Sequence, residues 1–288
     1  MAYALIQNDE LISDEIIPAI VPWWSFTKTI IAAAALVLVR DKILSLDEPC
    51  SGNAYTLRQL LQHEAGFSDY GDLPDYHASV KAGMPPWSVG ELMVRVNALN
   101  SVSAPGENWA YSNIGYLHVR RLIERGLDES LDSVLQRLIF RPLGLHHTRV
   151  ANIPSDLSNV VMGGMYNYHP GWVYHGLLVG PLTEAVAALR GLLTASLFPD
   201  CLLIEMLKIR TLGGPIAGRP WISPGYGLGV MAGETDNKLS VVGHTGGGPG
   251  SVIAVYHTTE PMPITCAAFS TSEEEIDVER IVVSKLAP

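Results

Sequence analysis

The stretch "PWWSFTKTIIAAAAL", residues 22–36, places a serine and a lysine at the start of an almost wholly apolar run. Apolar residues fill nearly every position after Thr29, so the run predicts a helix over about residues 25–40 with no face left for solvent. A lysine on such a helix has to be buried, and burying an ammonium group is costly. The position of Lys28 therefore requires a chemical reason.

Ser25 and Lys28 form an S-x-x-K pair. Side chains three positions apart on a helix are neighbours, with Cβ atoms roughly 5–6 Å apart. A serine hydroxyl becomes a good nucleophile when a base takes its proton, and a lysine can be that base once burial lowers its pKa. The first helical turn also favours developing negative charge, because its N–H groups are free. By itself, however, the pair indicates only a serine that caps a helix and a lysine that extends to solvent.

Two further motifs lie far along the chain. "YSN", residues 111–113, falls in a loop just before a predicted helix, where a tyrosine can relay protons and an asparagine amide can hold a substrate carbonyl. "HTGGG", residues 244–248, falls on a predicted strand, where glycines let the backbone approach a substrate and donate N–H groups to an oxyanion. Each motif alone is explained as a helix cap or a hairpin corner. All three together, in this order, indicate nucleophilic catalysis.

The remaining pattern predicts helices between two groups of strands. "YALIQNDELISDE", residues 3–15, predicts a hairpin that turns at Asn8-Asp9. Short β-branched runs predict an antiparallel meander over residues 226–233, 238–247, 251–258 and 264–271. Helices are expected over residues 55–67, 88–99, 114–126, 127–144, 183–193, 197–210 and 273–287, the first with Thr56 as its cap and Gly66 as its stop.

This order predicts an α/β (α+β) fold, in which an antiparallel β-sheet flanked by helices adjoins an all-helical subdomain. Residues 1–45 and 205–288 are expected to form the sheet-containing subdomain, and residues 46–204 the mainly helical one. We expect one structural unit with its site in the cleft between the two parts. The loops 68–87 and 151–181 are expected to shape that site.

The composition argues against several classes of protein. The chain has 288 residues, of which 48% are hydrophobic and 17% charged, as in a compact globular protein. Its net charge of −10, without a Lys/Arg cluster, makes nucleic acid and anionic membranes poor partners. The start of the chain lacks the features of a signal peptide, and the longest apolar run, residues 30–39, is too short to span a bilayer. We therefore expect a cytoplasmic protein.

Neither a metal nor an organic cofactor is expected. Cys50, Cys201 and Cys266 lie far apart and are predicted to be small buried hydrophobes rather than a disulfide framework or a zinc site. His146 and His147 are adjacent, so their side chains point apart, and no third ligand has a suitable spacing. The sequence also lacks the G-x-S-x-G elbow of α/β-hydrolases and the lysine of a phosphate-binding loop.

Taken in order, S-x-x-K, Y-x-N and [HK]-T-G resemble the signature of the penicillin-recognising serine hydrolases. The histidine form of the third motif is similar to the class C β-lactamase-related branch, which includes β-lactamases, D-stereospecific peptidases and esterases. The same branch is indicated by "LRQLLQHEAGFSDY" (57–70), "PGENWAYSNIGY" (105–116) and "RPLGLHHT" (141–148). The resemblance covers about residues 20–257 and implies a β-lactamase/transpeptidase-like fold.

The resemblance implies a role for each matching residue of the first two motifs. Ser25 would be the nucleophile that becomes acylated. Lys28 and Tyr111 would share the general-base and general-acid work, and Tyr111 would activate the water that releases the acyl group. Asn113 would orient the acyl side chain or the leaving group.

In the third motif, the resemblance implies contacts with the substrate. His244 and Thr245 would line its far side, and the N–H groups of Ser25 and Gly247 would form an oxyanion hole. Gly246, which lies between Thr245 and Gly247, would also be part of the substrate-binding segment. Position 244 carries His rather than Lys, and a neutral imidazole attracts a carboxylate less than an ammonium does. This difference favours an ester or a neutral amide as substrate.

Only 24 residues precede Ser25, where the family usually has a helix that covers one face of the sheet. We expect that helix to be absent or trimmed. An uncovered face would expose apolar surface. Another element or a partner chain, such as a second copy in a homo-oligomer, would then have to bury it.

The sequence therefore predicts a serine hydrolase that cleaves an ester or amide of a small molecule through an acyl-enzyme on Ser25. A β-lactam and a D-amino-acid peptide are candidate substrates. One alternative is a non-catalytic penicillin-binding-like ligand or scaffold module that keeps the fold. Another is a transpeptidase-like enzyme that passes the acyl group to an amine.

Overall fold

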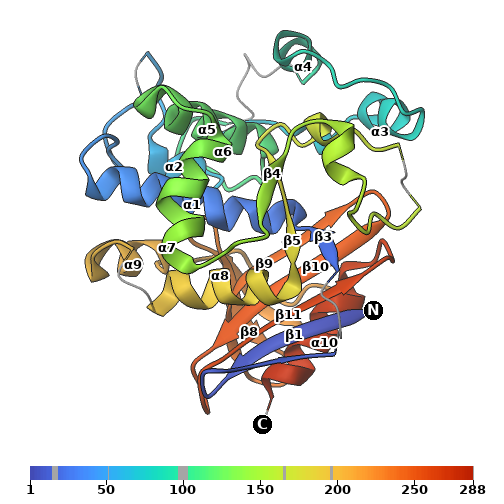
Figure 1. Ribbon diagram of the computed structural model, residues 1–288. Helices are drawn as coiled ribbons and strands as arrows, with labels where there is room; N and C mark the ends of the chain where they lie inside the picture. The colour runs from blue at the N-terminus through green and yellow to red at the C-terminus, as the bar shows by residue number, and fades with distance from the viewer. Residues whose placement is uncertain (15–18, 51, 97–102, 165–166, 195–196, 288) are drawn as a thin grey trace.

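The computed structural model describes residues 1–14, 19–50, 52–96, 103–164, 167–194 and 197–287. Eight strands in these segments form one antiparallel sheet, in the order β2-β1-β11-β10-β9-β8-β7-β6 (Figure 1). The strands of this sheet are β1 (Ala2–Gln7), β2 (Glu10–Ser13), β6 (Arg210–Thr211), β7 (Trp221–Tyr226), β8 (Met231–Thr235), β9 (Ser240–Gly248), β10 (Ser251–Thr258) and β11 (Ile264–Ser270).

A smaller sheet and the helices fill the middle of the chain. The smaller sheet has the order β3-β5-β4 and lies between the large sheet and the helical part. Its strands are β3 (Ile20–Pro22), β4 (Arg149–Ala151) and β5 (Leu177–Pro181). The α-helices are α1 (Thr27–Arg40), α2 (Leu57–Leu61), α3 (Pro74–Lys81), α4 (Val89–Arg95), α5 (Asn113–Leu127), α6 (Leu131–Leu135), α7 (Arg141–Leu143), α8 (Leu182–Thr194), α9 (Asp200–Met206) and α10 (Glu275–Leu286). Shorter turns include the 3-10 helices η1 (Trp24–Phe26) and η2 (Tyr70–Asp72).

The N-terminal hairpin is confirmed. β1 and β2 pair antiparallel with Gln7 opposite Glu10, which leaves a two-residue loop. Both loop residues, Asn8 and Asp9, have positive φ values of 50° and 62°. Two positive φ values in a two-residue loop are what a hairpin turn with a right-handed strand twist requires, and Asn and Asp adopt them readily.

Helices cover both faces of the sheet around its central strand, β10. Ile253 and Val255 face the core that contains α8, whereas Ala254 and Tyr256 face the smaller core that contains α10. All eight residues of β10 are buried, as expected for a strand covered on both sides. α10 thus covers part of the face that we expected to be bare, while Leu11 and Ile12 of the edge strand β2 stay 51% and 40% exposed.

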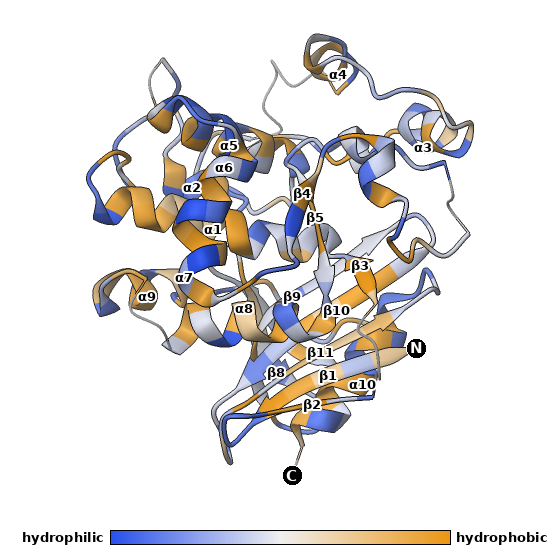
Figure 2. Cartoon of the chain, viewed as in Figure 1, coloured by the Kyte–Doolittle hydropathy of each residue, from blue (hydrophilic) through white to orange (hydrophobic). Residues whose placement is uncertain are grey.

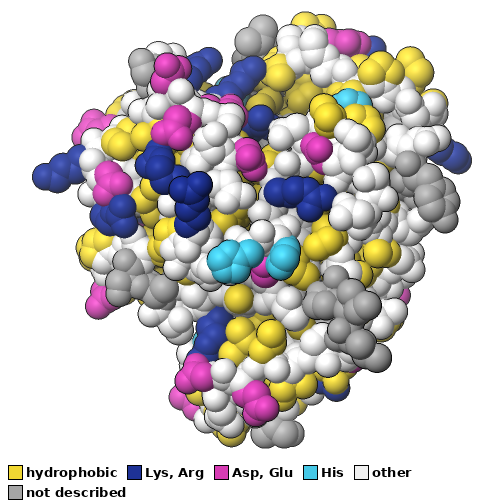
Figure 3. All heavy atoms as spheres, in the orientation of Figure 1, with side chains coloured by type: hydrophobic (Ala, Val, Ile, Leu, Met, Phe, Trp, Pro, Cys, Tyr) yellow, Lys and Arg dark blue, Asp and Glu magenta, His cyan; other side chains and the backbone are white. Residues whose placement is uncertain are grey.

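α1 runs between the sheet and the helical part and has no solvent face, as predicted. Residues 27–38 are all buried, including Lys28, and only the last turn reaches the surface. Figure 2 shows α1 as an apolar helix at the centre of the molecule. On the face seen in Figure 3, acidic and basic side chains are interspersed over the helical part.

Some elements differ from the prediction for identifiable reasons. α2 is capped by Thr56 as predicted, but it stops after Leu61 because the chain turns left-handed at His63 (φ 61°), before the predicted stop at Gly66. The predicted loop 68–87 contains α3, which begins with Pro74 at its first position, where proline is well tolerated. The predicted loop 151–181 ends in the buried strand β5.

The strand predicted over residues 226–233 is in fact two strands. β7 ends at Tyr226, the chain turns through Gly227–Val230 with Gly229 at φ 78°, and β8 begins at Met231. β7 itself starts earlier, at Trp221, and includes Pro224 and Gly225. Proline is tolerated there because the neighbouring edge strand β6 has only two residues. Of the predicted helix 88–99, α4 accounts for the beginning, and residues 97–99 lie outside the described residues.

The cap of α2 gives a test of the local structure. The Thr56 hydroxyl accepts the Gln59 N–H at 3.3 Å, and the Gln59 side chain accepts the Thr56 N–H at 2.9 Å. We expect Thr56→Ala to lower the free energy of unfolding by about 1 kcal/mol, and Thr56→Ser to keep most of it. Denaturant unfolding followed by circular dichroism measures both variants. Equal stability of the alanine and wild-type proteins would contradict this account of the helix start.

Candidate functional site

The turn η1 holds Ser25 in a strained backbone segment. Trp24 has φ 40°, a left-handed conformation that is unfavourable for a bulky residue. Its indole N–H donates to Ser251 Oγ at 3.0 Å, and its ring packs on Gly248, where a Cβ would lie 2.5 Å from the ring carbons. Contacts to β9 and β10 therefore fix the conformation of the residue before the serine.

Ser25 Oγ lies within hydrogen-bond reach of both groups that the sequence assigned to it. Lys28 Nζ is 3.1 Å from Ser25 Oγ, and Tyr111 Oη donates to the same oxygen at 2.9 Å. These distances are those of ordinary hydrogen bonds. The structure thus brings together a hydroxyl, an amine and a phenol from residues up to 86 positions apart.

The amine of Lys28 is wholly buried. Burial lowers the pKa of Lys28 to about 7, against the opposing effect of the Asp69 charge. The amine also donates to Asn113 Oδ1 at 2.6 Å and lies 3.4 Å from His175 Nε2. At neutral pH a large fraction of Lys28 is therefore uncharged and able to accept a proton from Ser25.

Tyr111 behaves in the opposite way. Burial raises the pKa of the Tyr111 phenol far above its ordinary range, and its hydrogen bond to Ser25 offsets only part of that effect. The phenol is therefore protonated at any working pH, so it donates a hydrogen bond to Ser25 Oγ and is not present as a phenolate base. In the same motif, Ser112 caps α5 by accepting the Gly115 N–H at 3.2 Å.

The "HTG" residues of β9 divide between the two faces of the sheet. His244 lies on the α1 side, where its Nε2 is 2.9 Å from Tyr226 Oη, and burial lowers the pKa of His244 to about 3. Thr245 points the other way, and its hydroxyl donates to Glu279 of α10 at 2.6 Å. The structure therefore does not bring the Thr245 side chain to the substrate side, because neighbours on a strand face opposite ways.

The glycines of β9 permit a close approach to the serine. A Cβ on Gly246 would lie 2.7 Å from the backbone nitrogen of Ser25 and 2.9 Å from Trp23 O. Such distances are too short for any side chain, so only glycine fits between β9 and η1. The backbone of β9 is consequently packed directly against the backbone of the turn that holds Ser25.

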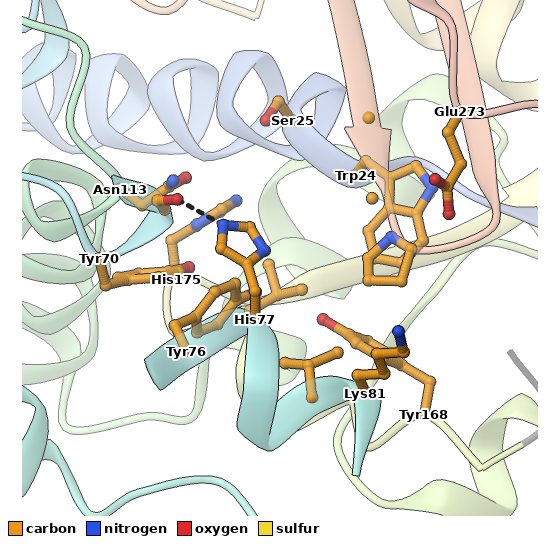
Figure 4. A pocket seen from close by; sticks show the side chains of 16 residues that line it. Trp24, Ser25, Tyr70, Tyr76, His77, Lys81, Asn113, Tyr168, His175 and Glu273 are labelled. Atoms are coloured by element: carbon orange, nitrogen blue, oxygen red, sulfur yellow. Dashed lines mark hydrogen bonds between the residues drawn. The ribbon is translucent and has the colours of Figure 1, made fainter. Parts of the chain in front are cut away.

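A cavity of about 630 Å³ opens beside Ser25 (Figure 4). Ser25, Asn113 and Gly247 line it, whereas His244, Thr245 and Gly246 do not. Both predicted pocket loops contribute to the cavity. Residues 68–87 supply Tyr70, Gly71, Tyr76, His77, Val80 and Lys81, and residues 151–181 supply Tyr168, Val173 and His175. The other lining residues are Trp24, Gly248, Pro249 and Glu273. The walls therefore include the aromatic rings of Trp24, Tyr70, Tyr76 and Tyr168.

Sequence reasoning missed two residues of the site, Asp69 and His175. Asp69 accepts both the backbone and the side-chain N–H of Asn113, each at 2.8 Å. The ring centroid of His63 lies 4.3 Å from that of Tyr111. No motif spacing points to Asp69 or His175, although Asp69 falls within the quoted stretch 57–70.

The surroundings of His146 and His147 and the lengths of the helices can be compared with the expectations of no metal and no membrane span. The backbone N–H groups of His146 and His147 both donate to the carboxylate of Glu184 at 2.9 Å. Within the described residues, no group of three His, Cys, Asp or Glu side chains is arranged to hold a metal ion. In the same segments, no helix has the length and apolar character needed to cross a bilayer.

Comparison with known proteins gives a consistent family. The model of the family described as Beta-lactamase matches residues 19–283. Penicillin-binding protein 4* of Bacillus subtilis (strain 168) is 24% identical over 246 residues, which cover 79% of this chain and 54% of that protein. The chain thus spans about half the length of this curated relative.

Solved structures share the fold at low identity. A D-stereospecific amidohydrolase from Streptomyces sp. has a TM-score of 0.82 at 19% identity and covers 99% of this chain and 93% of its own. The D-amino acid amidase from Ochrobactrum anthropi SV3 has a TM-score of 0.76 at 20% identity, covering 92% of this chain and 86% of its own. An octameric penicillin-binding protein homologue from Pyrococcus abyssi reaches 0.76 at 19%, covering 94% and 69%. The predicted β-lactamase/transpeptidase-like fold is confirmed.

The titration of Lys28 can be measured directly. In protein labelled with ¹³C at lysine Cε, we expect one lysine signal to titrate near pH 7, because burial disfavours the ammonium form. That signal should be missing from Lys28→Met and should remain in Lys208→Met, which removes an exposed lysine and serves as the control. A spectrum in which every lysine titrates above pH 10 would rule out a neutral amine at this site.

Proposed function

The chain belongs to the β-lactamase family, and from this premise we propose that it is a serine hydrolase that cleaves an amide, lactam or ester through an acyl-enzyme on Ser25. The observation that carries the proposal is the contact of a wholly buried amine with a serine hydroxyl, Lys28 Nζ to Ser25 Oγ at 3.1 Å. A lysine with a pKa near neutrality is the base that a serine nucleophile needs.

Acylation follows from the positions of these groups. Ser25 Oγ attacks the carbonyl carbon while its proton passes to Lys28 Nζ. The N–H groups of Ser25 and Gly247 stabilise the negative charge that develops on the carbonyl oxygen. This assignment is supported by Gly246, the residue before Gly247, which packs directly against the backbone nitrogen of Ser25. When the tetrahedral intermediate collapses, the C–N or C–O bond breaks and the departing atom takes a proton from the Tyr111 hydroxyl, 2.9 Å from Ser25 Oγ. Tyr111 receives in exchange the proton that Lys28 took from Ser25, so the phenol and the amine are both neutral again before water enters.

Deacylation reuses the same base. Water attacks the Ser25 ester, gives a proton to Lys28, and the acid product leaves as Ser25 Oγ regains its proton. We assign this step to Lys28 rather than to Tyr111, because burial raises the pKa of the phenol and keeps it protonated. His175 Nε2, at 3.4 Å, and Asn113 Oδ1, at 2.6 Å, can accept the remaining N–H groups of the lysine ammonium.

The cavity suggests an acyl group with an aromatic or bulky apolar side chain. Four aromatic rings line the cavity, those of Trp24, Tyr70, Tyr76 and Tyr168, and rings of this kind bury large apolar groups well. His244 is buried and neutral, so this position offers no cation to a lactam carboxylate. D-Phenylalanine amide is therefore a better first substrate than a cephalosporin, in keeping with the D-specific enzymes among the similar structures.

The nucleophile can be identified without knowing the substrate. A fluorophosphonate probe should label Ser25, as read by mass spectrometry of the peptide, and Ser25→Ala should abolish the label. Lys28→Met should slow labelling at least 100-fold, on the order expected for loss of a general base, whereas Lys208→Met should label like the wild type. Labelling of another residue, or none, would favour the alternative of a non-catalytic binding module.

A parallel substrate panel tests the acyl preference. We expect hydrolysis of D-phenylalanine amide and of p-nitrophenyl esters of increasing acyl length, with little turnover of nitrocefin. L-Phenylalanine amide is the stereochemical control. Faster turnover of nitrocefin than of the amides and esters would show that the site does take a lactam carboxylate.

A further inference from the structure

Asp69 makes no hydrogen bond to Ser25 or Lys28, but it holds Asn113, the residue that lies between Asp69 and Lys28. It lies just before η2, and its two carboxylate oxygens accept hydrogen bonds from one residue, Asn113. Oδ1 accepts the backbone N–H and Oδ2 accepts the side-chain Nδ2–H, each at 2.8 Å. Oδ2 also accepts the Gly71 N–H at 3.4 Å. Burial raises the pKa of this carboxyl, whereas the three donors and the charge of Lys28 oppose that effect and favour its ionised form.

These contacts decide which end of the Asn113 amide faces Lys28. A carboxylate only accepts hydrogen bonds, so it selects the NH₂ end of the amide. The oxygen end is then left to Lys28 Nζ, 2.6 Å away. If the amide were reversed, its oxygen would face the carboxylate and its NH₂ would face the lysine N–H groups, so both contacts would become repulsive.

We propose that Asp69 is a positioning residue for the reaction: its partly buried carboxylate locks the Asn113 amide with the oxygen toward Lys28 and supplies the negative charge that keeps this amine a competent base. The inference rests on the proposed function, because it concerns the same lysine. It adds a residue to that function that touches neither the nucleophile nor the substrate cavity.

The other titratable groups that face Lys28 are neutral, so the charge of Asp69 acts alone among the described residues. His63 lies in the turn after α2, Tyr111 in the loop before α5, and Tyr116 on α5 itself. His175 lies in the loop before β5, and His244 lies on β9. Burial lowers the pKa of each of these histidines and raises the pKa of each tyrosine. Charged side chains further out act on these groups rather than on Lys28 itself: Arg120 on His175, Arg219 on His244, and Glu275 on Tyr111.

The charge of Asp69 changes the pKa of Lys28 in one direction. The Asp69 carboxylate favours the ammonium form of Lys28 and so raises its pKa against the effect of burial. Without that charge the pKa of Lys28 falls further. The amine would then be uncharged at lower pH, but it would also be a weaker base toward Ser25. The activity should therefore begin at lower pH and reach a lower maximum.

The test measures how fast a fluorophosphonate labels Ser25 of the full chain as a function of pH, because this reagent has no titrating group of its own. Asp69→Asn keeps the shape of the side chain but removes its charge, and it sets an amide N–H against an N–H of Asn113. We expect the midpoint of the rate profile to fall by about one pH unit, and the plateau rate at high pH to fall about tenfold.

Asp72→Asn is the matched control. It removes the same charge three residues further on, from a side chain that is exposed and therefore screened by solvent. We expect its midpoint and plateau to equal those of the wild type. A melting curve for each variant separates a loss of folding from an effect on the base.

The outcomes are distinguishable. If the wild type is not labelled at Ser25, the proposed function is wrong. If it is labelled but the Asp69→Asn midpoint coincides with that of the wild type, this inference alone is overturned. Should Asp69→Asn fail to fold, Asp69→Ala brings no N–H against Asn113 and is expected to shift the midpoint in the same direction. Failure of both variants to fold would assign Asp69 to the fold and also overturn the inference.

Discussion

The burial of one amine is the constraint on which the rest of the site depends. Lys28 is fully buried with a pKa near 7, which corresponds to about 5 kcal/mol of preference against its charged form relative to an exposed lysine. The unfolded chain binds this proton up to about pH 10.5, so the folded state is penalised in full below pH 7 and the penalty fades as the pH rises toward 10.5. A fold that only needed a stable core would place an apolar residue here. The apolar helix α1, which made the lysine conspicuous, is also what makes it a base.

The sheet holds the other half of the site from behind. Gly246 brings the backbone of β9 against that of η1, Gly248 leaves room for the Trp24 ring, and Thr245 is held on the opposite face by Glu279 of α10. Glu279 is itself fully buried and paired with Arg219, and it also accepts the Trp221 indole N–H at 3.1 Å. The strand that carries the "HTG" motif is therefore anchored on the α10 side, and its α1 side packs directly on the turn that holds Ser25.

Much of this could be predicted from the sequence, where a local spacing encodes it. S-x-x-K, "YSN" and "HTGGG" each have a fixed internal spacing, and the apolar run of α1 and the Asn8-Asp9 turn follow from simple rules. Asp69 and His175 could not be found in this way, because each acts through contacts with residues 44 and 147 positions away. The end of α2 was misplaced because a histidine, not the nearby glycine, adopts the left-handed conformation. The orientation of Thr245, by contrast, was available from the period of two along a strand, which sets it opposite His244.

A single physical effect also divides the chemistry between the two groups at Ser25. Loss of water disfavours the charged form of any side chain, so it lowers the pKa of an amine and raises that of a phenol. Lys28 and Tyr111 share one buried environment and contact one oxygen, yet burial makes the first a proton acceptor and fixes the second as a donor. The surrounding histidines are neutral for the same reason, so they do not repel the ammonium that forms when Ser25 loses its proton. Among the residues that the structure describes, the charge of Asp69 then remains to attract that ammonium, and the same carboxylate fixes the orientation of the Asn113 amide between them.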